Sequence, residues 1–373
     1  MLLQNGLIAL FFTTVVHGQC QKDPRKIIKA MNGEVAQLRL VFAHRGIQTR
    51  TAVENSIEAI NEAAKIDVDG VELDVQIAKD GSLWPSHDTR VGRITNYKRR
   101  SADTLFDIIK DDPRGPKNPR IRDLDHDQMN GLFLRNKMGE VQKGVHMHSV
   151  DYLLTQVKAK YPDLVIVLDV KSADAVQPSA ALVQRLGMED QVVIKFLASW
   201  IPPLAVPSAT RGVKFIVVVY CNMLDDLVDR GTGPSPEEKV ISSLSGYLVF
   251  PNYVSMEPPT KNWYVSANKE LVIPVGPGGF VDLWMVNRAK RGIGKFHLTN
   301  DNKLGTIDSL GHCCVDANSY LATSRYFGSE LPDQRFDADV VLRSSDWVTT
   351  DAPLAVLGRA MREGYRVQRD TLC

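Results

Sequence analysis

The sequence predicts an α/β fold of the TIM type, a (β/α)8 barrel with insertions. Eight apolar segments rich in β-branched residues alternate with segments of helical periodicity, as expected for parallel strands joined by helices. Several of these segments are apolar at every position, which indicates strands covered on both faces. The alternative is a doubly wound open sheet, but no Gly-x-Gly-x-x-Gly motif follows the first predicted strand. We therefore prefer the barrel.

Eight strands can be placed along the chain. They are expected at 39–46, 69–78, 164–171, 192–197, 213–220, 247–253, 271–276 and 346–351. Apolar residues at helical spacing predict intervening helices, for example over 56–66 and 149–161. We expect the barrel to occupy residues 38–373. Insertions are expected near 97–123, which is charged and rich in proline, and near 300–339, which is weakly periodic.

The first residues are typical of a secretory signal peptide. An apolar run from Leu7 to Val16 precedes small residues at a plausible cleavage site, so residues 1–18 are expected to be removed. Ten apolar residues are too few to cross a bilayer of about 30 Å, so no stable membrane insertion is predicted. The expected location is secreted, extracellular or periplasmic.

The cysteine count agrees with export. Five cysteines allow one or two disulfides, and their pairing stays open: Cys20, Cys221, Cys313, Cys314 and Cys373.

The overall charge is nearly balanced. The chain has 45 Lys and Arg against 44 Asp and Glu, a net charge of +1, which gives no reason to expect a nucleic-acid surface. The sequence leaves the oligomeric state open.

Charged side chains cluster where the predicted strands end. His44 and Arg45 follow the first strand, and Glu72 and Asp74 lie two residues apart in the second, so they share a face. Asp169 and Lys171 do the same at the end of the third strand. In a barrel these ends meet around the active site. Carboxylates in such a group suit a hard divalent metal ion, which prefers oxygen ligands.

A second histidine suggests acid–base chemistry. His87 follows the second strand, directly before Asp88. One histidine can accept a proton from an attacking oxygen while the other donates one to a leaving alcohol. A metal ion with Arg and Lys would neutralise a phosphoryl group. The set therefore suits hydrolysis of a small phosphodiester.

The same residues carry a resemblance to a known family. The motifs "HRG", "EN", "VELDV", "KDG" and "HD", followed by "LDVK" and "VTTDAP", resemble those of the glycerophosphodiester phosphodiesterases. The resemblance runs through most of residues 40 to 355, densely up to residue 90. It implies a TIM-type barrel with one divalent ion, Ca²⁺ or Mg²⁺. It also implies hydrolysis of a small-molecule glycerophosphodiester to sn-glycerol 3-phosphate and an alcohol.

The resemblance also assigns roles to individual residues. It implies that His44 and His87 form the acid–base pair. Glu72 and Asp74 would bind the metal, with Asp169 where the family usually has Glu. The implied substrate contacts are Arg45, Glu54, Lys171 and Trp284.

Two departures from the family pattern stand out. Val53 replaces the usual Pro before Glu54. Trp284, in "LWMVN", imperfectly matches the family's late Trp-Thr-Val-Asn motif and lies about 60 residues before "VTTDAP". Either an insertion splits the last repeat, or "VIPVG" is the seventh strand and Trp284 lies on a helix.

The sequence leaves two other functions open. One is a phospholipase D-like enzyme on the same barrel, acting on lysophospholipid or sphingomyelin. The "HRG" and "EN" block favours the first family. The other is a non-catalytic secreted binding barrel, but binding alone does not need both histidines.

The pair His44 and Arg45 leads to a geometric prediction. Neighbours on a strand face opposite ways, so both can reach one phosphate only if the strand ends at His44 and the chain turns. Gly46 tolerates the required backbone conformation. We therefore expect Gly46 to turn the chain and bring Arg45 over the site.

Overall fold

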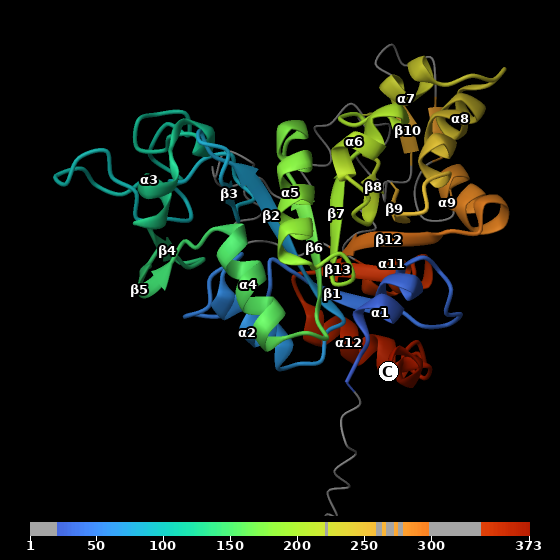
Figure 1. Ribbon diagram of the computed structural model, residues 1–373, viewed down its shortest axis with the longest axis horizontal. Coiled ribbons are helices and arrows are strands. Elements are labelled where there is room, and N and C mark those ends of the chain that lie inside the picture. Colours follow the sequence, from blue (N-terminus) through green and yellow to red (C-terminus); the bar gives the residue numbers. More distant parts are fainter. Residues whose placement is uncertain (1–20, 221–222, 259–262, 266–271, 275–278, 298–336) are drawn as a thin grey trace, which may run out of the picture.

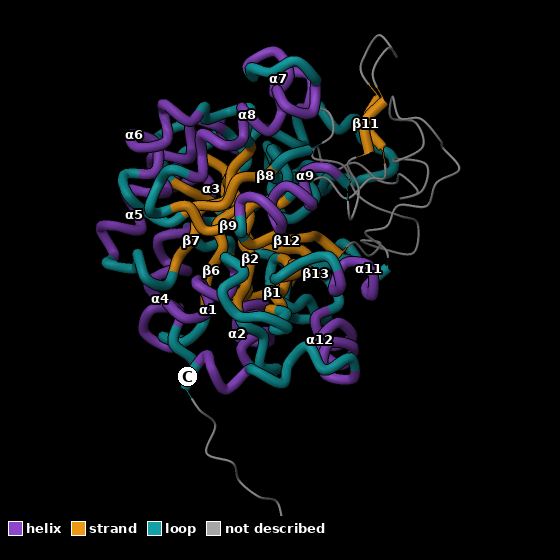
Figure 2. The backbone as a smooth tube through the Cα atoms, turned by 90° about the vertical axis from the view of Figure 1, so that its right-hand side faces the viewer, coloured by secondary structure: helices purple, strands orange, loops and turns teal. Residues whose placement is uncertain are grey.

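A closed barrel of eight parallel strands forms the centre of the molecule, as predicted. The computed structural model describes residues 21–220, 223–258, 263–265, 272–274, 279–297 and 337–373. The barrel closes because β1 pairs with both β13 and β2, and strand order around the barrel follows chain order (Figure 2). The strands are β1 (Leu40–His44), β2 (Gly70–Ile77), β6 (Val165–Val170), β7 (Val192–Leu197), β8 (Phe215–Val218), β9 (Tyr253–Glu257), β12 (Gly292–His297) and β13 (Trp347–Thr350).

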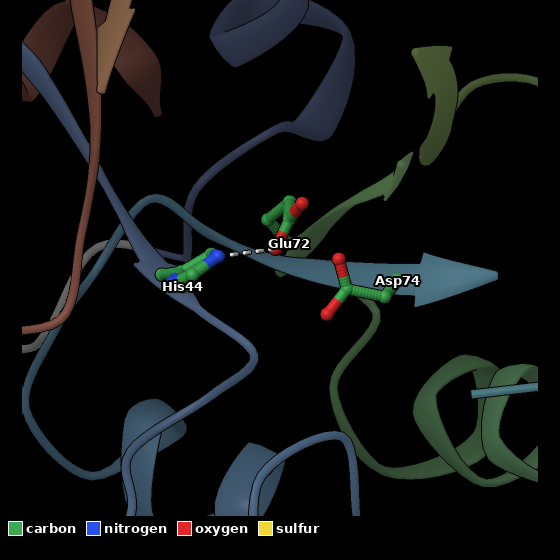
Figure 3. Close-up of side chains that lie close together, drawn as sticks. All are labelled: His44, Glu72 and Asp74. Atoms are coloured by element: carbon green, nitrogen blue, oxygen red, sulfur yellow. Dashed lines mark ion pairs between the residues drawn. The ribbon is translucent and has the colours of Figure 1, made fainter. Parts of the chain in front are cut away.

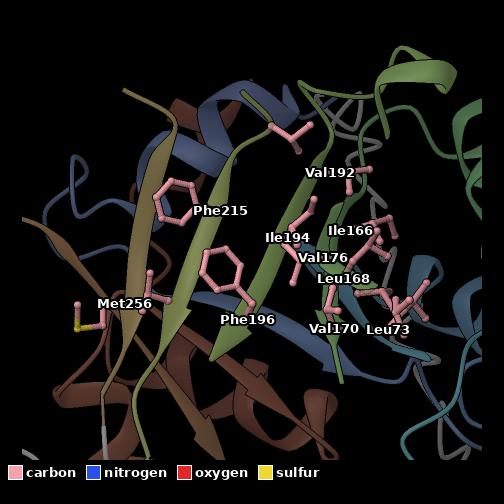
Figure 4. Close-up of a cluster of buried hydrophobic side chains, with 14 of the residues drawn as sticks. Leu73, Ile166, Leu168, Val170, Val176, Val192, Ile194, Phe196, Phe215 and Met256 are labelled. Carbon is pink, nitrogen blue, oxygen red and sulfur yellow. The ribbon is translucent and has the colours of Figure 1, made fainter. Parts of the chain in front are cut away.

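Helices surround this barrel. They are α2 (Ile57–Ala64), α4 (Val150–Lys160), α5 (Ala173–Leu186), α6 (Val206–Thr210), α7 (Leu224–Arg230), α8 (Pro236–Leu248), α9 (Phe280–Trp284), α11 (Ala338–Arg343) and α12 (Pro353–Arg362). The short elements η2 (Pro203–Ala205), η4 (Met285–Ala289) and η6 (Arg369–Leu372) complete this layer. The main core lies between strands and helices, where Leu73, Ile166 and Phe196 are fully buried (Figure 4). Because helices cover the outer face of the strands, their outward-pointing residues are apolar, and the strand sequences lack the alternation of apolar and polar residues.

The inner face of the barrel has a second, separate core. Because side chains alternate along a strand, the residues between those of the main core point inward. At the N-terminal ends of the strands these inward residues are apolar and buried. We call this cluster the lower layer: Ile27, Ile28, Ala30, Met31, Leu38, Leu40, Phe42, Val165, Val167, Val193, Ile216, Val254, Trp347 and Leu372.

A helix that precedes the predicted barrel closes its lower end. Helix α1 (Pro24–Met31) starts at Asp23, whose side chain accepts a hydrogen bond from the Arg25 N–H. Its apolar face supplies four of the lower-layer residues. The helix approaches β12 so closely that a Cβ on Gly292 would lie 1.9 Å from the Met31 carbonyl oxygen. The start of the predicted barrel at residue 38 therefore omitted a segment that packs into it.

Two strand predictions were wrong. The segment 247–253 spans the last two residues of α8, the turn after it and only the first residue of β9, so the strand starts at the end of the predicted segment. In segment 271–276, β11 (Val272–Pro274) pairs with β10 (Trp263–Val265) in a separate antiparallel sheet of two strands. The seventh barrel strand is instead β12. Its two glycines interrupt the apolar pattern that would predict a strand. Gly294 is required because a Cβ there would lie 2.0 Å from the Trp347 ring.

Between β2 and β6 the chain makes a long excursion from the barrel. It contains β3 (Leu83–Trp84), η1 (Ile121–Asp123), α3 (His126–Asn130), β4 (Phe133–Arg135) and β5 (Val141–His146), at the left of Figure 1. The excursion has its own buried cluster, which includes Trp84, Ile94 and Met129. The insertion expected near 97–123 lies inside it.

Some predictions fall on other parts of the chain. Residues 1–18, and residues 300–336 of the second expected insertion, lie outside the described residues. Cys373 is disulfide-bonded, and the other four cysteines also lie outside the described residues. Within the described part of the chain, we find no helix with the length and apolar character needed to cross a membrane.

Candidate active site

The C-terminal ends of the barrel strands carry charged side chains on their inner face. Side chains two residues apart on a strand share a face. The inward-pointing Phe42, Val167 and Val193 are therefore followed, two residues later on the same strands, by His44, Asp169 and Lys195. All of these charged residues are buried. We call this group the upper layer: His44, Glu72, Asp74, Asp169, Lys195 and Glu257.

Three upper-layer residues could hold a metal ion. His44, Glu72 and Asp74 each offer a ligand atom, and these atoms lie within 4.8 Å of one another (Figure 3). Both Glu72 oxygens are buried without a hydrogen-bond donor among the described residues. Burial and the nearby Asp74 carboxylate raise the pKa of Glu72 to about 7. A divalent cation would satisfy these oxygens, so the residues present fit the ion that the family resemblance implies.

Asp74 is held firmly by its neighbours. The Asn55 amide donates to Asp74 Oδ2 at 2.9 Å, and Asn55 Oδ1 accepts from the Asp74 N–H at 3.0 Å. Lys171 Nζ lies 2.7 Å from Asp74 Oδ1, and Arg45 Nε lies 2.8 Å from Oδ2. Although burial opposes ionisation, Lys171 and Arg45 hold the pKa of Asp74 well below its usual range. Asp74 is therefore a fixed anion.

Asp169 stands beside Asp74 but faces two lysines. The two aspartates are opposite each other in the pairing of β2 with β6. Asp169 Oδ2 lies 2.7 Å from Lys171 Nζ and 3.1 Å from Lys195 Nζ. Its role as a metal ligand stays a prediction, because the group with metal-ligand spacing contains His44 in its place.

His44 is oriented by a residue from the last strand end. Asp351, just after β13, lies 2.6 Å from His44 Nδ1, and the Phe296 ring packs edge-on against the imidazole at 4.7 Å between centroids. Burial opposes the charged imidazole, but the Asp351 and Glu72 carboxylates together outweigh it and raise the pKa of His44. His44 Nε2 faces the Glu72 carboxylate at 3.8 Å. Asp351 was part of the "VTTDAP" match, but its contact with His44 was not foreseen.

His87 is oriented in the same way by Asp88. Asp88 Oδ1 lies 3.1 Å from His87 Nδ1. Burial and the Arg45 guanidinium lower the pKa of His87. The two predicted acid–base residues thus share one arrangement, in which a carboxylate takes Nδ1 and leaves Nε2 for proton transfer.

Arg93, which sequence reasoning missed, ties two parts of the site together. Its guanidinium donates to Asp88 Oδ2 at 2.6 Å and to both Glu54 oxygens, at 2.5 and 3.2 Å. Although burial opposes ionisation, Arg93 lowers the pKa of both carboxyl groups to about 2, together with Arg45 at Glu54 and with His87 at Asp88. Glu54 Oε1 also lies 3.5 Å from Arg45 Nη1. Arg93 therefore holds in place both Asp88, which contacts His87, and Glu54, which contacts Arg45.

The turn after β1 has the predicted geometry. The strand ends at His44, Arg45 has φ 57° and Gly46 has φ 80°. A Cβ on Gly46 would lie 2.7 Å from Ala59 in α2, so this position excludes other residues. The Arg45 guanidinium reaches Asp74 rather than pointing away from it. Contact between Arg45 and a phosphate stays a prediction, as does that for Lys171.

Trp284 lies on a helix, which decides between the two alternatives only in part. It is the last residue of α9 and packs, half-buried, against the main core. The "VIPVG" segment is nevertheless not a barrel strand. A contact between Trp284 and substrate stays an untested prediction.

Two further residues of the upper layer were missed. Lys195 is the only charged residue in the apolar segment 192–197, which was a usable signal. Glu257 lies beyond the misplaced sixth strand, so its position could not be foreseen. Lys195 Nζ lies 3.4 Å from Glu257 Oε2.

Comparison with known proteins adds to this geometry. Residues 44–182 match the Glycerophosphoryl diester phosphodiesterase family. The resemblance predicted from the sequence is thereby confirmed. The matched segment begins at His44 and contains all the predicted site residues except Trp284.

Relatives match over a short stretch at higher identity or over a longer stretch at lower identity. A "Glycerophosphodiester phosphodiesterase" of Caldanaerobacter subterraneus is 44% identical over 71 residues, 19% of this chain and 29% of that protein. One of Bacillus subtilis is 24% identical over 230 residues, 60% of this chain and 76% of that protein. The Caldanaerobacter match thus spans less than a third of that relative's length.

Solved structures share the fold. A glycerophosphoryl diester phosphodiesterase of Parabacteroides distasonis superposes with a TM-score of 0.56 at 13% identity, covering 92% of this chain and 93% of that one. A phosphodiesterase of Oleispira antarctica, solved in complex with the product sn-glycerol-3-phosphate, gives a TM-score of 0.51 at 12% identity. It covers 87% of this chain and 97% of that one.

Proposed function

We propose that this chain is a metal-dependent phosphoric diester hydrolase that cleaves glycerophosphodiesters to sn-glycerol 3-phosphate and an alcohol. One observation carries the proposal: Glu72 and Asp74 bring buried carboxylate oxygens close enough together to hold one ion, with the His44 imidazole beside them, inside the segment that matches the family. The named product of the Oleispira structure supports the same reaction class.

In this proposal Glu72 and Asp74 hold one Ca²⁺ or Mg²⁺ ion, with Asp169 as a further candidate ligand. When bound, the ion neutralises phosphoryl charge and polarises the phosphorus–oxygen bonds. Arg45 and Lys171, already next to Asp74, add positive charge on the same side.

The two histidines carry the protons. Asp351 and Asp88 each take one Nδ1, so each imidazole presents Nε2 to the reacting atoms. One Nε2 accepts the proton of the attacking oxygen and the other returns a proton to the departing alcohol. Trp284 and Glu54 are proposed substrate contacts. Glu54 also supports Arg45 directly.

We also propose that the protein is exported. The composition of residues 1–18 and the disulfide at Cys373 support this, because disulfides persist in oxidising compartments. Mass spectrometry of protein from the culture medium or periplasm tests the proposal. The expected chain lacks the first ~18 residues, and an uncleaved cytoplasmic chain would refute it.

The hydrolase proposal is tested with the full chain and glycerophosphocholine. We expect equal release of choline and sn-glycerol 3-phosphate with calcium or magnesium, complete loss in EDTA, and recovery when the ion is restored. The proposal would be refuted if neither calcium nor magnesium supported hydrolysis, or if activity were complete in EDTA. Lysophosphatidylcholine and sphingomyelin, run in parallel, test the phospholipase D-like alternative.

A further inference from the structure

Lys195 sits at the edge of the candidate metal site in an unusual way. It is on β7, next to β6, and pairs in register with Asp169. Its side chain is only 5% exposed. Although burial disfavours the charged form, the neighbouring carboxylates hold the pKa of Lys195 above its usual range, so the ammonium keeps a charge that water screens poorly.

The Lys195 ammonium lies among three carboxylates. Nζ is 3.1 Å from Asp169 Oδ2, 3.4 Å from Glu257 Oε2 and 3.5 Å from Glu72 Oε1. Glu72 is at the same time one of the three residues with metal-ligand spacing. The same carboxylate is therefore offered to two cations, one fixed to the chain and one from solution.

We propose that Lys195 is a positioning residue that weakens metal binding, because its ammonium is a tethered cation that competes with the divalent ion for Glu72 and Asp169. The inference rests on the proposed metal-dependent function and says what sets the affinity of that site. Without the ion, Lys195 offsets the repulsion between neighbouring carboxylates and keeps the upper layer folded. With the ion bound, two cations share one set of carboxylates, and this repulsion lowers the affinity.

Such a site is filled only where the divalent ion is abundant. Calcium sites of extracellular modules bind at about 10⁻⁴–10⁻³ M, far more weakly than intracellular buffers. A cation built into the barrel is one physical way to reach that range with buried carboxylates. The proposed export and the proposed weak site therefore agree.

The chain offers a matched control in Lys295. This lysine is also fully buried on a barrel strand, β12, but its ammonium pairs with Asp282 of α9 at 3.0 Å. Removing either ammonium unbalances a buried ion pair and destabilises the fold. Of these two lysines, Lys195 alone has its charge beside Glu72, so its removal should change metal affinity and that of Lys295 should not.

The test is a calcium titration of chelator-treated, full-length protein by calorimetry, without substrate. The calcium Kd of Lys195→Met should be at least ten times lower than that of the wild type. For Lys295→Met it should stay within threefold. Metal-free Lys195→Met should melt below the metal-free wild type, and calcium should raise its Tm by more. A purely structural role of Lys195 would not tighten calcium binding.

A Kd for Lys195→Met that is unchanged within threefold, or higher, would overturn the inference, and so would absence of calcium binding in every variant. If metal-free Lys195→Met is insoluble, Lys195→Gln takes its place under the same criteria. Tighter calcium binding by Lys195→Met without glycerophosphocholine hydrolysis by the wild type would support this inference and refute the hydrolase. Glycerophosphocholine hydrolysis by the wild type, without tighter calcium binding by Lys195→Met, would support the hydrolase and refute this inference.

Discussion

The lower and upper layers of the barrel interior are built on the same strands but contain opposite chemistry. In β1, Leu40 and Phe42 contribute to the lower layer and His44 to the upper one, two residues further along. The lower layer is apolar and closed by α1, whereas the upper layer consists of paired charges. A strand can thus supply stability at one end and chemistry at the other, because its side-chain period of two keeps both sets on the same face.

The comparison predicts that substitutions in the two layers have separable effects. Lower-layer changes should alter the free energy of unfolding while the catalytic rate is retained. Changes to the reacting groups should alter the rate while the fold is retained. The supporting network around Arg93 should show a smaller, pH-dependent effect.

The largest effect is expected from His87→Ala. It should lower turnover of glycerophosphocholine by at least ~100-fold, because general acid–base catalysis typically contributes ~10²–10⁴. The melting temperature should change little, since the His87 side chain is 27% exposed. His126→Ala, which removes an exposed histidine of α3, is the control and should keep full activity. Near-normal turnover of His87→Ala would remove His87 from the mechanism.

The next effect is expected from Ile27→Ala, in the lower layer. Ile27 of α1 is fully buried, and a buried Ile→Ala change typically lowers the free energy of unfolding by about 2–5 kcal/mol. Turnover of the folded protein should be retained. Urea unfolding measures the loss, with the exposed neighbour Lys26→Ala as a control that should change it by less than about 0.5 kcal/mol. A large fall in turnover at full folding would show that the layers are coupled.

The smallest effect concerns the acid stability of Arg93→Met. Glu54 and Asp88 have pKa values of about 2, below their ordinary 4.5 and 3.8, because Arg93, with Arg45 beside Glu54 and His87 beside Asp88, outweighs the cost of burial. Their stabilising contribution is therefore present above the ordinary values and is lost as the pH falls toward 2.

Urea unfolding of the wild type and Arg93→Met between pH 6 and pH 3 measures this contribution. The wild type should be the more stable at pH 6, and the difference should shrink below about pH 4 as the carboxylates protonate. Parallel stability curves would show that Arg93 does not set these pKa values.

The sequence was sufficient to predict the barrel, its first five strands and its last strand because each is a short segment rich in apolar, β-branched residues. It was insufficient for β12, where Gly292 and Gly294 are dictated by the close approach of α1 and Trp347. The spacing of apolar residues along the chain does not indicate such tertiary contacts. The segment 247–253 was misread because an apolar helix end and an apolar strand look alike over a few residues.

The candidate site was predictable where its residues are close in sequence. Glu72 and Asp74 share a face on one strand, and His44 and Arg45 adjoin a turn glycine. The partners Asp351 and Lys195 come from other strands, so finding them needed the strand order. Lys195 had a local signal, a charge within an apolar run, but no indication of what it would pair with.

The account depends most on a divalent ion in the upper layer. The most direct measurement is an anomalous difference map, at long wavelength, from crystals of the full chain grown with calcium. We expect one calcium peak about 2.3–2.6 Å from carboxylate oxygens of both Glu72 and Asp74. Absence of a peak there, or a calcium ion bound only to other carboxylates, would contradict the account.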